Sequence, residues 1–114
     1  MRPDRDQQAL EDMPAHARRV ASLVRERNRS DLEADWIANA ALIRQLEVIG
    51  EAASRVSQGT PAQLPAVPWR AIVAMRNRLI HAYDVIDPDA VWRAASEDVP
   101  ALLDELERVL GGEA

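Results

Sequence analysis

"WIANAALIRQLEVIGEAASRVS", residues 36–57, is the stretch that decides the fold, because a helical pattern runs through it without a proline. Apolar residues recur along it at steps of three and four, which places them on one side of a helix. The stripe consists of Leu42, Leu46, Ile49, Ala53 and Val56, with Trp36, Ala40, Ile43 and Gly50 widening it. So broad an apolar surface predicts that this is the central helix.

The segment before this helix also has a helical pattern. Pro14 is expected either to kink that helix or to begin its main part, because proline lacks the backbone donor of a helix interior. "NRSDLEAD", residues 28–35, indicates a turn and a short helical piece capped by Ser30 or Asp31. The apolar stripe of the first helix consists of Leu10, Met13, Ala17, Val20 and Val24.

Prolines divide the second half of the chain. Three of them in "GTPAQLPAVP", residues 59–68, predict an extended connector, and the last suits the first turn of a helix from Trp69 towards Tyr83. Asp87 is the expected N-cap of the next helix. That last helix is predicted to continue, with a kink, across Pro100. Its stripe consists of Trp92, Ala95, Val99, Leu102, Leu106 and Val109.

The predicted fold class is all-α, because no segment alternates with the period of a strand. The simplest arrangement is an antiparallel bundle of four long helices plus a short extra helix. A chain of 114 residues has the length of one ordinary domain, so residues 1–114 are expected to form a single domain.

Composition excludes several classes of function. A net charge of −5 argues against a protein that coats nucleic acid by bulk electrostatics, although it allows a local basic cleft. With no cysteine and two widely spaced histidines, a zinc cluster is not expected, and we predict no metal or other cofactor. No apolar run approaches the roughly 20 residues of a membrane span. The polar start of the chain lacks a secretory signal, which predicts a cytoplasmic protein.

"MRNRLIHAYD", residues 75–84, gathers polar chemistry that the rest of the chain lacks. On a helical wheel at about 100° per residue, the apolar arc of this helix is centred near Arg76. His81, Asn77 and Asp84 lie together outside that arc. Arg76 and His81 lie about 140° apart. They can therefore serve one substrate only if the arginine bends round, the helix distorts, or a symmetry mate contributes.

Arg76 has two explanations at this stage. A cation within an apolar stripe must find a partner or extend to solvent, because an unpaired buried charge is very costly. One explanation is a structural ion pair with Glu47 or Glu51 of the central helix. The other is a phosphate ligand, and the spacing does not separate the two.

His81 also has two explanations, a solvated helix histidine or an acid–base group. Acid–base cleavage of a phosphodiester generally needs one group that takes a proton and another that gives one, and His16 is expected to be solvated. A two-fold dimer that apposes two copies of this helix would supply two His81 imidazoles and two Arg76 guanidiniums in one cleft, with Arg78 nearby.

An ordered set of motifs resembles a known family. The chain is similar, over about residues 6–110, to HEPN-domain toxins of the HepT type, which prokaryotes pair with a minimal nucleotidyltransferase antitoxin, MntA. The core of the resemblance is Arg76 followed by a polar residue, with His81 five positions after Arg76 and Tyr83 two positions after His81. The motifs are "IGEA" at 49–52, "PW" at 68–69, "MRNRLIHAY" at 75–83, "VW" at 91–92 and "VP" at 99–100.

The resemblance implies a homodimeric helical bundle and a metal-independent ribonuclease. It implies that His81 is the general acid/base in attack of a ribose 2′-hydroxyl on the adjacent phosphate. Arg76 would stabilise the charge that develops on the phosphorane. Asn77 would orient the imidazole or bind the phosphate.

The same resemblance implies regulation by a partner. Tyr83 matches the tyrosine to which the cognate antitoxin transfers AMP, a modification that would place bulk and negative charge beside the cleft. Glu51 would support the site by pairing with Arg76 or Arg78.

The leading hypothesis is therefore the toxin of a type VII-like toxin–antitoxin pair, a homodimer that cleaves RNA and is neutralised by an MntA-like nucleotidyltransferase. The alternative is a non-catalytic HEPN subunit that binds nucleotide or substrate for that partner. A third possibility is a plain dimeric scaffold in which Arg76 is only a buried ion pair.

Overall fold

The computed structural model describes residues 3–56, 59–82 and 85–111, and every regular element within these ranges is helical. The all-α prediction is confirmed. None of the helices in these ranges is long and apolar enough to cross a lipid bilayer. The elements are α1 (Pro3–Val24), α2 (Arg29–Ala34), α3 (Trp36–Ser54), α4 (Gly59–Gln63), α5 (Trp69–Ala82), α6 (Pro88–Arg93), η2 (Ala94–Asp98), α7 (Val99–Leu106) and η3 (Glu107–Gly111), of which η2 and η3 are π-helical.

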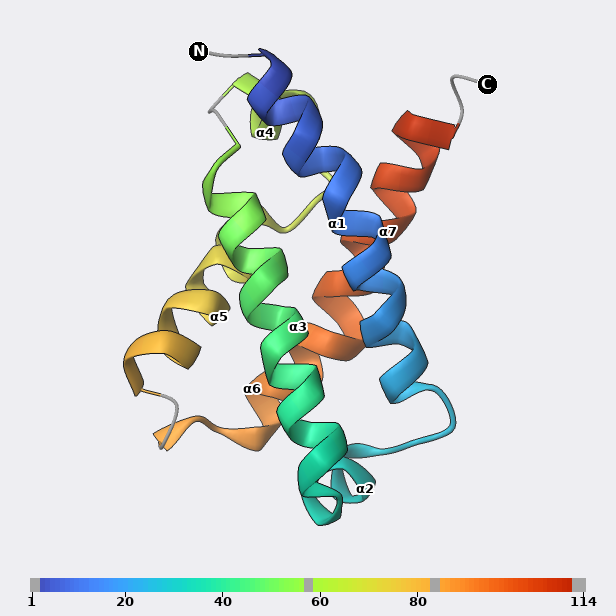
Figure 1. The fold of residues 1–114 in the computed structure, drawn as a ribbon, viewed down its shortest axis with the longest axis vertical. Helices are drawn as coiled ribbons and strands as arrows, with labels where there is room; N and C mark the ends of the chain where they lie inside the picture. Colours follow the sequence, from blue (N-terminus) through green and yellow to red (C-terminus); the bar gives the residue numbers. More distant parts are fainter. Residues whose placement is uncertain (1–2, 57–58, 83–84, 112–114) are drawn as a thin grey trace.

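The helix α3 lies at the centre, as its broad apolar stripe predicts. It packs against α1 on one side and α5 on the other, and α1 also packs against α7 (Figure 1). Successive long helices run in alternating directions, with α2 and α4 at opposite ends of α3. This arrangement places the motif helix α5 directly beside α3.

The core is built from the predicted stripes. Trp36 departs from its stripe: it is 76% exposed, because the first turn of α3 extends beyond the ends of α1 and α5 (Figure 1). Pro14 is buried within α1, and the helix continues on both sides of it. Side chains with at most 2% exposure include Met13, Ala17, Val20, Leu42, Ile49, Leu79, Ala95, Val99, Leu102 and Leu106.

Side-chain caps fix where α2, α3 and α6 begin. The N-cap of α2 is Asn28 rather than the predicted Ser30 or Asp31. Its side chain accepts a hydrogen bond from the backbone N–H of Asp31, whose carboxylate accepts one from the backbone N–H of Asn28. This reciprocal pair is a capping box, so Asp31 contributes from the third helical position. Asp35 caps α3, and Asp87 caps α6 as predicted.

The predicted extended connector is wrong in its first half, because Gly59–Gln63 forms the short helix α4. Pro61 stands in the first turn, where a helix needs no N–H donor from it. The Thr60 hydroxyl donates to the carboxylate of Asp6 at 2.8 Å and so joins α4 to α1. At the end of the connector, the Trp69 indole N–H donates to the carbonyl of Leu64 at 3.0 Å.

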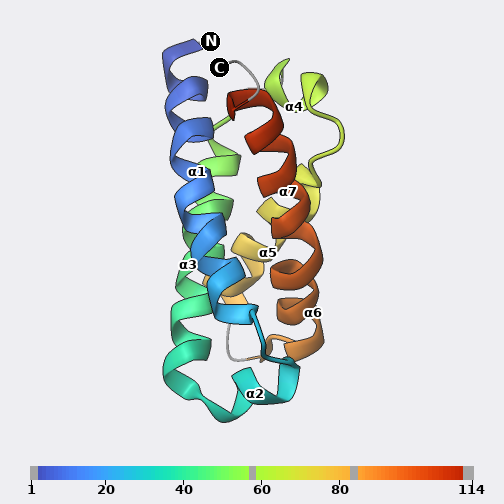
Figure 2. The ribbon, with the colours of Figure 1, turned by 90° about the vertical axis from the view of Figure 1, so that its right-hand side faces the viewer.

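The last helical run continues through Pro100, as Figure 2 shows. The backbone N–H of Val99 donates to the carbonyl of Ala94, five residues earlier, which is a π-helical bond. Pro100 has no N–H to donate. The wider π turn therefore lies just before the proline, where the ordinary helical bonding pattern has to change.

Candidate active site

Helix α5 packs against α3 at a point where only glycine fits. A Cβ atom built on Gly50 would lie 2.2 Å from the Cβ of Arg76 and 3.1 Å from the carbonyl oxygen of Ile72. The first distance is far below any van der Waals contact, so Gly50 lets the two helices approach. The sequence pattern predicted only that Gly50 widens the apolar stripe of its helix. Glycine inside a helix is about 1 kcal/mol less favourable than alanine, so its presence there was the one indication in the sequence of a close contact.

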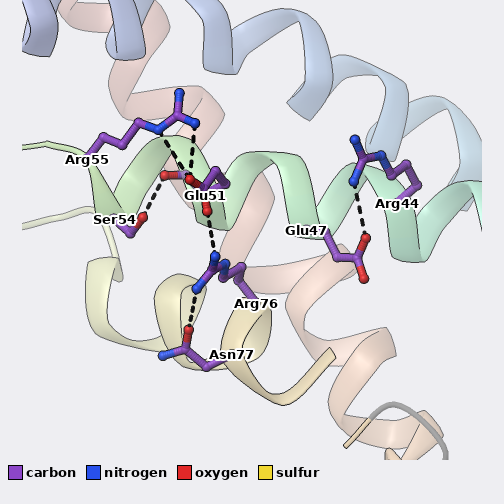
Figure 3. A network of polar contacts seen from close by, with 7 residues as sticks. All are labelled: Arg44, Glu47, Glu51, Ser54, Arg55, Arg76 and Asn77. Atoms are coloured by element: carbon purple, nitrogen blue, oxygen red, sulfur yellow. Dashed lines mark hydrogen bonds and ion pairs between the residues drawn. The ribbon is translucent and has the colours of Figure 1, made fainter. Parts of the chain in front are cut away.

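This contact holds Arg76 against α3 (Figure 3). Its Nη2 donates to Oε1 of Glu51 at 2.6 Å, and its Nη1 donates to Oδ1 of Asn77 at 2.9 Å. Nε of Arg76 is buried and has no hydrogen-bond partner among the described residues. The side chain is 27% exposed, so most of it is removed from solvent. An ion pair with Glu51 therefore exists, whereas Glu47 pairs with Arg44 at 3.5 Å.

Glu51 also binds a second arginine, which sequence reasoning missed. Oε2 of Glu51 lies 3.1 Å from Nη2 of Arg55 and accepts a hydrogen bond from its Nε at 3.2 Å. The signal was present in the sequence, because a glutamate four residues before an arginine is a favourable pair on a helix surface. Arg78 is exposed and makes no ion pair within the described part of the chain.

A shallow groove of about 640 Å³ runs along the exposed side of α3, between α1 and α5. We call it the α3 groove. Arg76 and Ile80 form its α5 side. On the α1 side, Nδ1 of His16 lies 2.7 Å from Oε1 of Gln45, so His16 is tied to α3 rather than only solvated. The lining residues are Glu11, Asp12, Ala15, His16, Arg44, Glu47, Val48, Glu51, Ala52, Arg55, Arg76 and Ile80.

His81 lies outside the α3 groove, in the last turn of α5. Its side chain is exposed and forms no hydrogen bond or ion pair with any residue in the described ranges. Asn77 binds Arg76 and does not contact the imidazole through a hydrogen bond. One chain therefore presents Arg76 and His81 on different faces of α5, as the helical wheel predicted.

Two apolar residues close to His81 in the sequence are exposed. Ile80, on the preceding position, is 45% exposed, and Val85, just beyond the end of α5, is 75% exposed. Tyr83, the predicted site of AMP transfer, lies outside the described residues, as does Asp84.

Comparisons with known proteins agree with one another. A family model described as "Ribonuclease HepT-like" matches residues 13–109. A protein of Thermococcus cleftensis named "Probable ribonuclease HepT" is 34% identical, over 88% of this chain and 91% of its own length. Two Methanocaldococcus jannaschii proteins, each named "Putative RNase", are also similar. One is 44% identical over 60% of this chain and 63% of its own length; the other is 28% identical over 95% and 94%. No solved structure matches the chain.

Proposed function

The chain belongs to the HepT-like ribonuclease family, and from that premise we propose that it cleaves RNA by a metal-independent acid–base mechanism. The observation that carries this proposal is the arrangement of the motif on α5. Arg76 is fixed by Glu51 and Asn77, and His81 stands one and a half turns later with its imidazole exposed and unengaged by described residues. A fixed cation can stabilise the charge that develops on the phosphate, and a free imidazole can take or give a proton, as phosphodiester cleavage by acid–base catalysis needs.

In the proposed reaction, the ribose 2′-oxygen attacks the adjacent phosphorus atom and the bond to the 5′-oxygen breaks. One imidazole takes the proton of the 2′-hydroxyl, and a protonated imidazole gives a proton to the departing 5′-oxygen. The products are a 2′,3′-cyclic phosphate and a 5′-hydroxyl. Arg76 retains one free N–H on each Nη atom after binding Glu51 and Asn77, and this edge would bind the phosphorane oxygens.

The proposal includes a homodimer, because one protomer does not bring Arg76 and His81 to a common face. A two-fold axis beside α5 would place the His81 of one copy near the Arg76 of the other. The exposed apolar side chains of Ile80 and Val85 support this, since they lie close to His81 in the sequence and would be removed from water at such an interface. In this arrangement Asn77 positions the guanidinium group, Glu51 is its counter-ion, and Arg78 adds positive charge to the cleft.

The first test is cleavage of a mixed RNA pool by the purified, unmodified protein in the presence of EDTA. We expect new fragments that end in a 2′,3′-cyclic phosphate, detected by mapping the fragment ends. EDTA should not reduce the rate, because the protein supplies every proposed group. Absence of cleavage by a folded, dimeric protein that mass spectrometry shows to be unmodified would contradict the proposal.

We further propose that the chain is the toxin of a type VII-like pair, neutralised when a nucleotidyltransferase antitoxin transfers AMP to Tyr83. Bulk and negative charge at this position would oppose the approach of RNA. The Tyr83→Phe variant removes the acceptor hydroxyl and should remain toxic when the antitoxin is co-expressed, whereas growth with the wild type should recover. Intact mass measurement should show an added AMP on the wild type alone. Full neutralisation of Tyr83→Phe would refute the modification.

One observation favours the alternative, a non-catalytic subunit that binds nucleotide or substrate for the nucleotidyltransferase. Arg76 already has a structural partner in Glu51 at 2.6 Å, so its place on α5 does not require a part in the chemical step. A subunit of this kind would bind RNA or nucleotide without cutting it, so the EDTA assay separates the two functions.

A further inference from the structure

Glu51 lies between two arginines and cannot balance both. Its Oε1 binds Arg76 of α5, and its Oε2 binds Arg55 of its own helix α3 (Figure 3). Two guanidinium groups against one carboxylate leave this triad with one positive charge. Arg44 and Glu47, on the same face of α3, form a pair at 3.5 Å with no excess charge. The triad itself therefore carries a net positive charge, beside two acidic residues on the α1 side of the α3 groove.

Arg55 has free donors after binding Glu51. It uses Nε and one N–H of Nη2 for the carboxylate, while Nη1 makes no hydrogen bond to any residue in the described ranges. The side chain is 66% exposed, against 27% for Arg76. Five N–H groups in a rigid fork suit arginine to phosphate, and here at least two remain open to solvent on the groove side of α3.

The two arginines are also held at a defined separation, because they bind opposite oxygens of one carboxylate. Arg76 lies 2.6 Å from one oxygen and Arg55 lies 3.1 Å from the other, so the shared carboxylate keeps the two guanidinium groups near each other. Basic groups placed side by side so that they can follow a phosphate backbone are typical of single-stranded nucleic-acid binding.

We infer that Arg55 binds the phosphate next to the one at Arg76, so that the Arg55–Glu51–Arg76 triad is a two-phosphate site for a single RNA strand. This inference rests on the proposed function. Arg55 would act in substrate binding and not in the chemical step. Its ion pair with Glu51 is a solvent-exposed pair four residues apart on one helix, a kind that contributes little to stability. Removing Arg55 should therefore leave the fold intact.

The test measures binding of a 2′-O-methyl oligoribonucleotide, which lacks the attacking hydroxyl, over a series of salt concentrations. Arg55→Ala should raise Kd on the order of tenfold and should reduce the slope of log K against log salt by about 0.7, the value for one phosphate contact with a single strand. With a cleavable RNA, KM should rise while kcat stays near the wild-type value. Arg55→Lys keeps the positive charge, so its slope of log K against log salt should stay close to that of the wild type.

Arg18→Ala is the matched control, because Arg18 is 59% exposed and pairs with Glu107 at 3.1 Å, away from the α3 groove. It removes the same charge and should leave the slope unchanged. If both alanine variants lowered the salt slope equally, the effect would come from the change in net charge alone, and the inference would be overturned. A fall in kcat with unchanged Kd and slope would also overturn it, since Arg55 would then only position Glu51. If the wild type neither binds nor cleaves RNA, the proposed function itself fails.

Discussion

His81→Ala is expected to reduce RNA cleavage by about 10²- to 10⁴-fold, the usual contribution of a general acid or base. The imidazole is exposed and makes no hydrogen bond within the described ranges, so its loss should leave the melting temperature and the oligomeric state unchanged. Initial cleavage rates, circular dichroism and size-exclusion chromatography measure the three quantities. The same variant should no longer inhibit growth when expressed without an antitoxin.

His16→Ala is the matched control for this experiment, because it removes the other histidine of the chain. His16 binds Gln45 on the far side of the α3 groove from Arg76 and should affect cleavage by severalfold at most. Comparable losses in both variants would argue that both imidazoles act in catalysis. An active His81→Ala protein would remove His81 from the mechanism and favour the binding subunit.

Gly50→Ala is expected to damage both stability and activity. The added Cβ would lie 2.2 Å from the Cβ of Arg76, an atom that cannot rotate away as the end of a long side chain could. Helix α5 must therefore move away from α3, and overpacking of this kind typically costs about 1–3 kcal/mol. Alanine recovers about 1 kcal/mol through its better helix propensity, which offsets only part of the cost. Urea denaturation should show a lower midpoint.

Activity should fall further than stability alone explains, because the movement of α5 would lengthen the contact between Arg76 and Glu51. Cleavage measured at a temperature where the variant is fully folded separates the two effects. Gly59→Ala is the control, since a Cβ built on Gly59 has no neighbour within 4 Å. Its free energy of unfolding should change by less than about 0.5 kcal/mol. Equal stabilities for the two variants would show that α5 tolerates the displacement.

Local sequence patterns predicted the helices and their buried faces well. A stripe at steps of three and four depends only on the geometry of one helix, so Met13, Leu42 and Leu102 could be placed in the core before any packing was known. The same geometry placed Arg76 and His81 on different sides of α5. The capping residue of α2 was harder to predict, because Asn28, Ser30 and Asp31 are all good capping residues. The N-cap is the one whose backbone is extended just before the helix, and here that residue is Asn28.

Contacts between helices were harder to predict, because they depend on how far two helices overlap and how closely they approach. Trp36 belongs to the stripe of α3 by spacing, yet it is exposed, because the first turn of α3 extends beyond the ends of α1 and α5. Arg76 binds Glu51 rather than Glu47 because α5 meets α3 at Gly50, the residue just before Glu51. Arg55 was missed for the same reason, since its importance comes from sharing Glu51 with a residue on another helix.

The close contact at Gly50 has a consequence for the evolution of the chain. A mutation that adds a side chain at this position forces the helices apart whatever residue stands at position 76, because every residue except glycine has a Cβ there. Among descendants of such a protein, loss of the glycine should therefore disturb the contact between Arg76 and Glu51 even where the arginine is kept. A sequence that keeps the Arg-x4-His motif without the glycine is then a candidate for a degenerate copy whose nuclease activity has decayed.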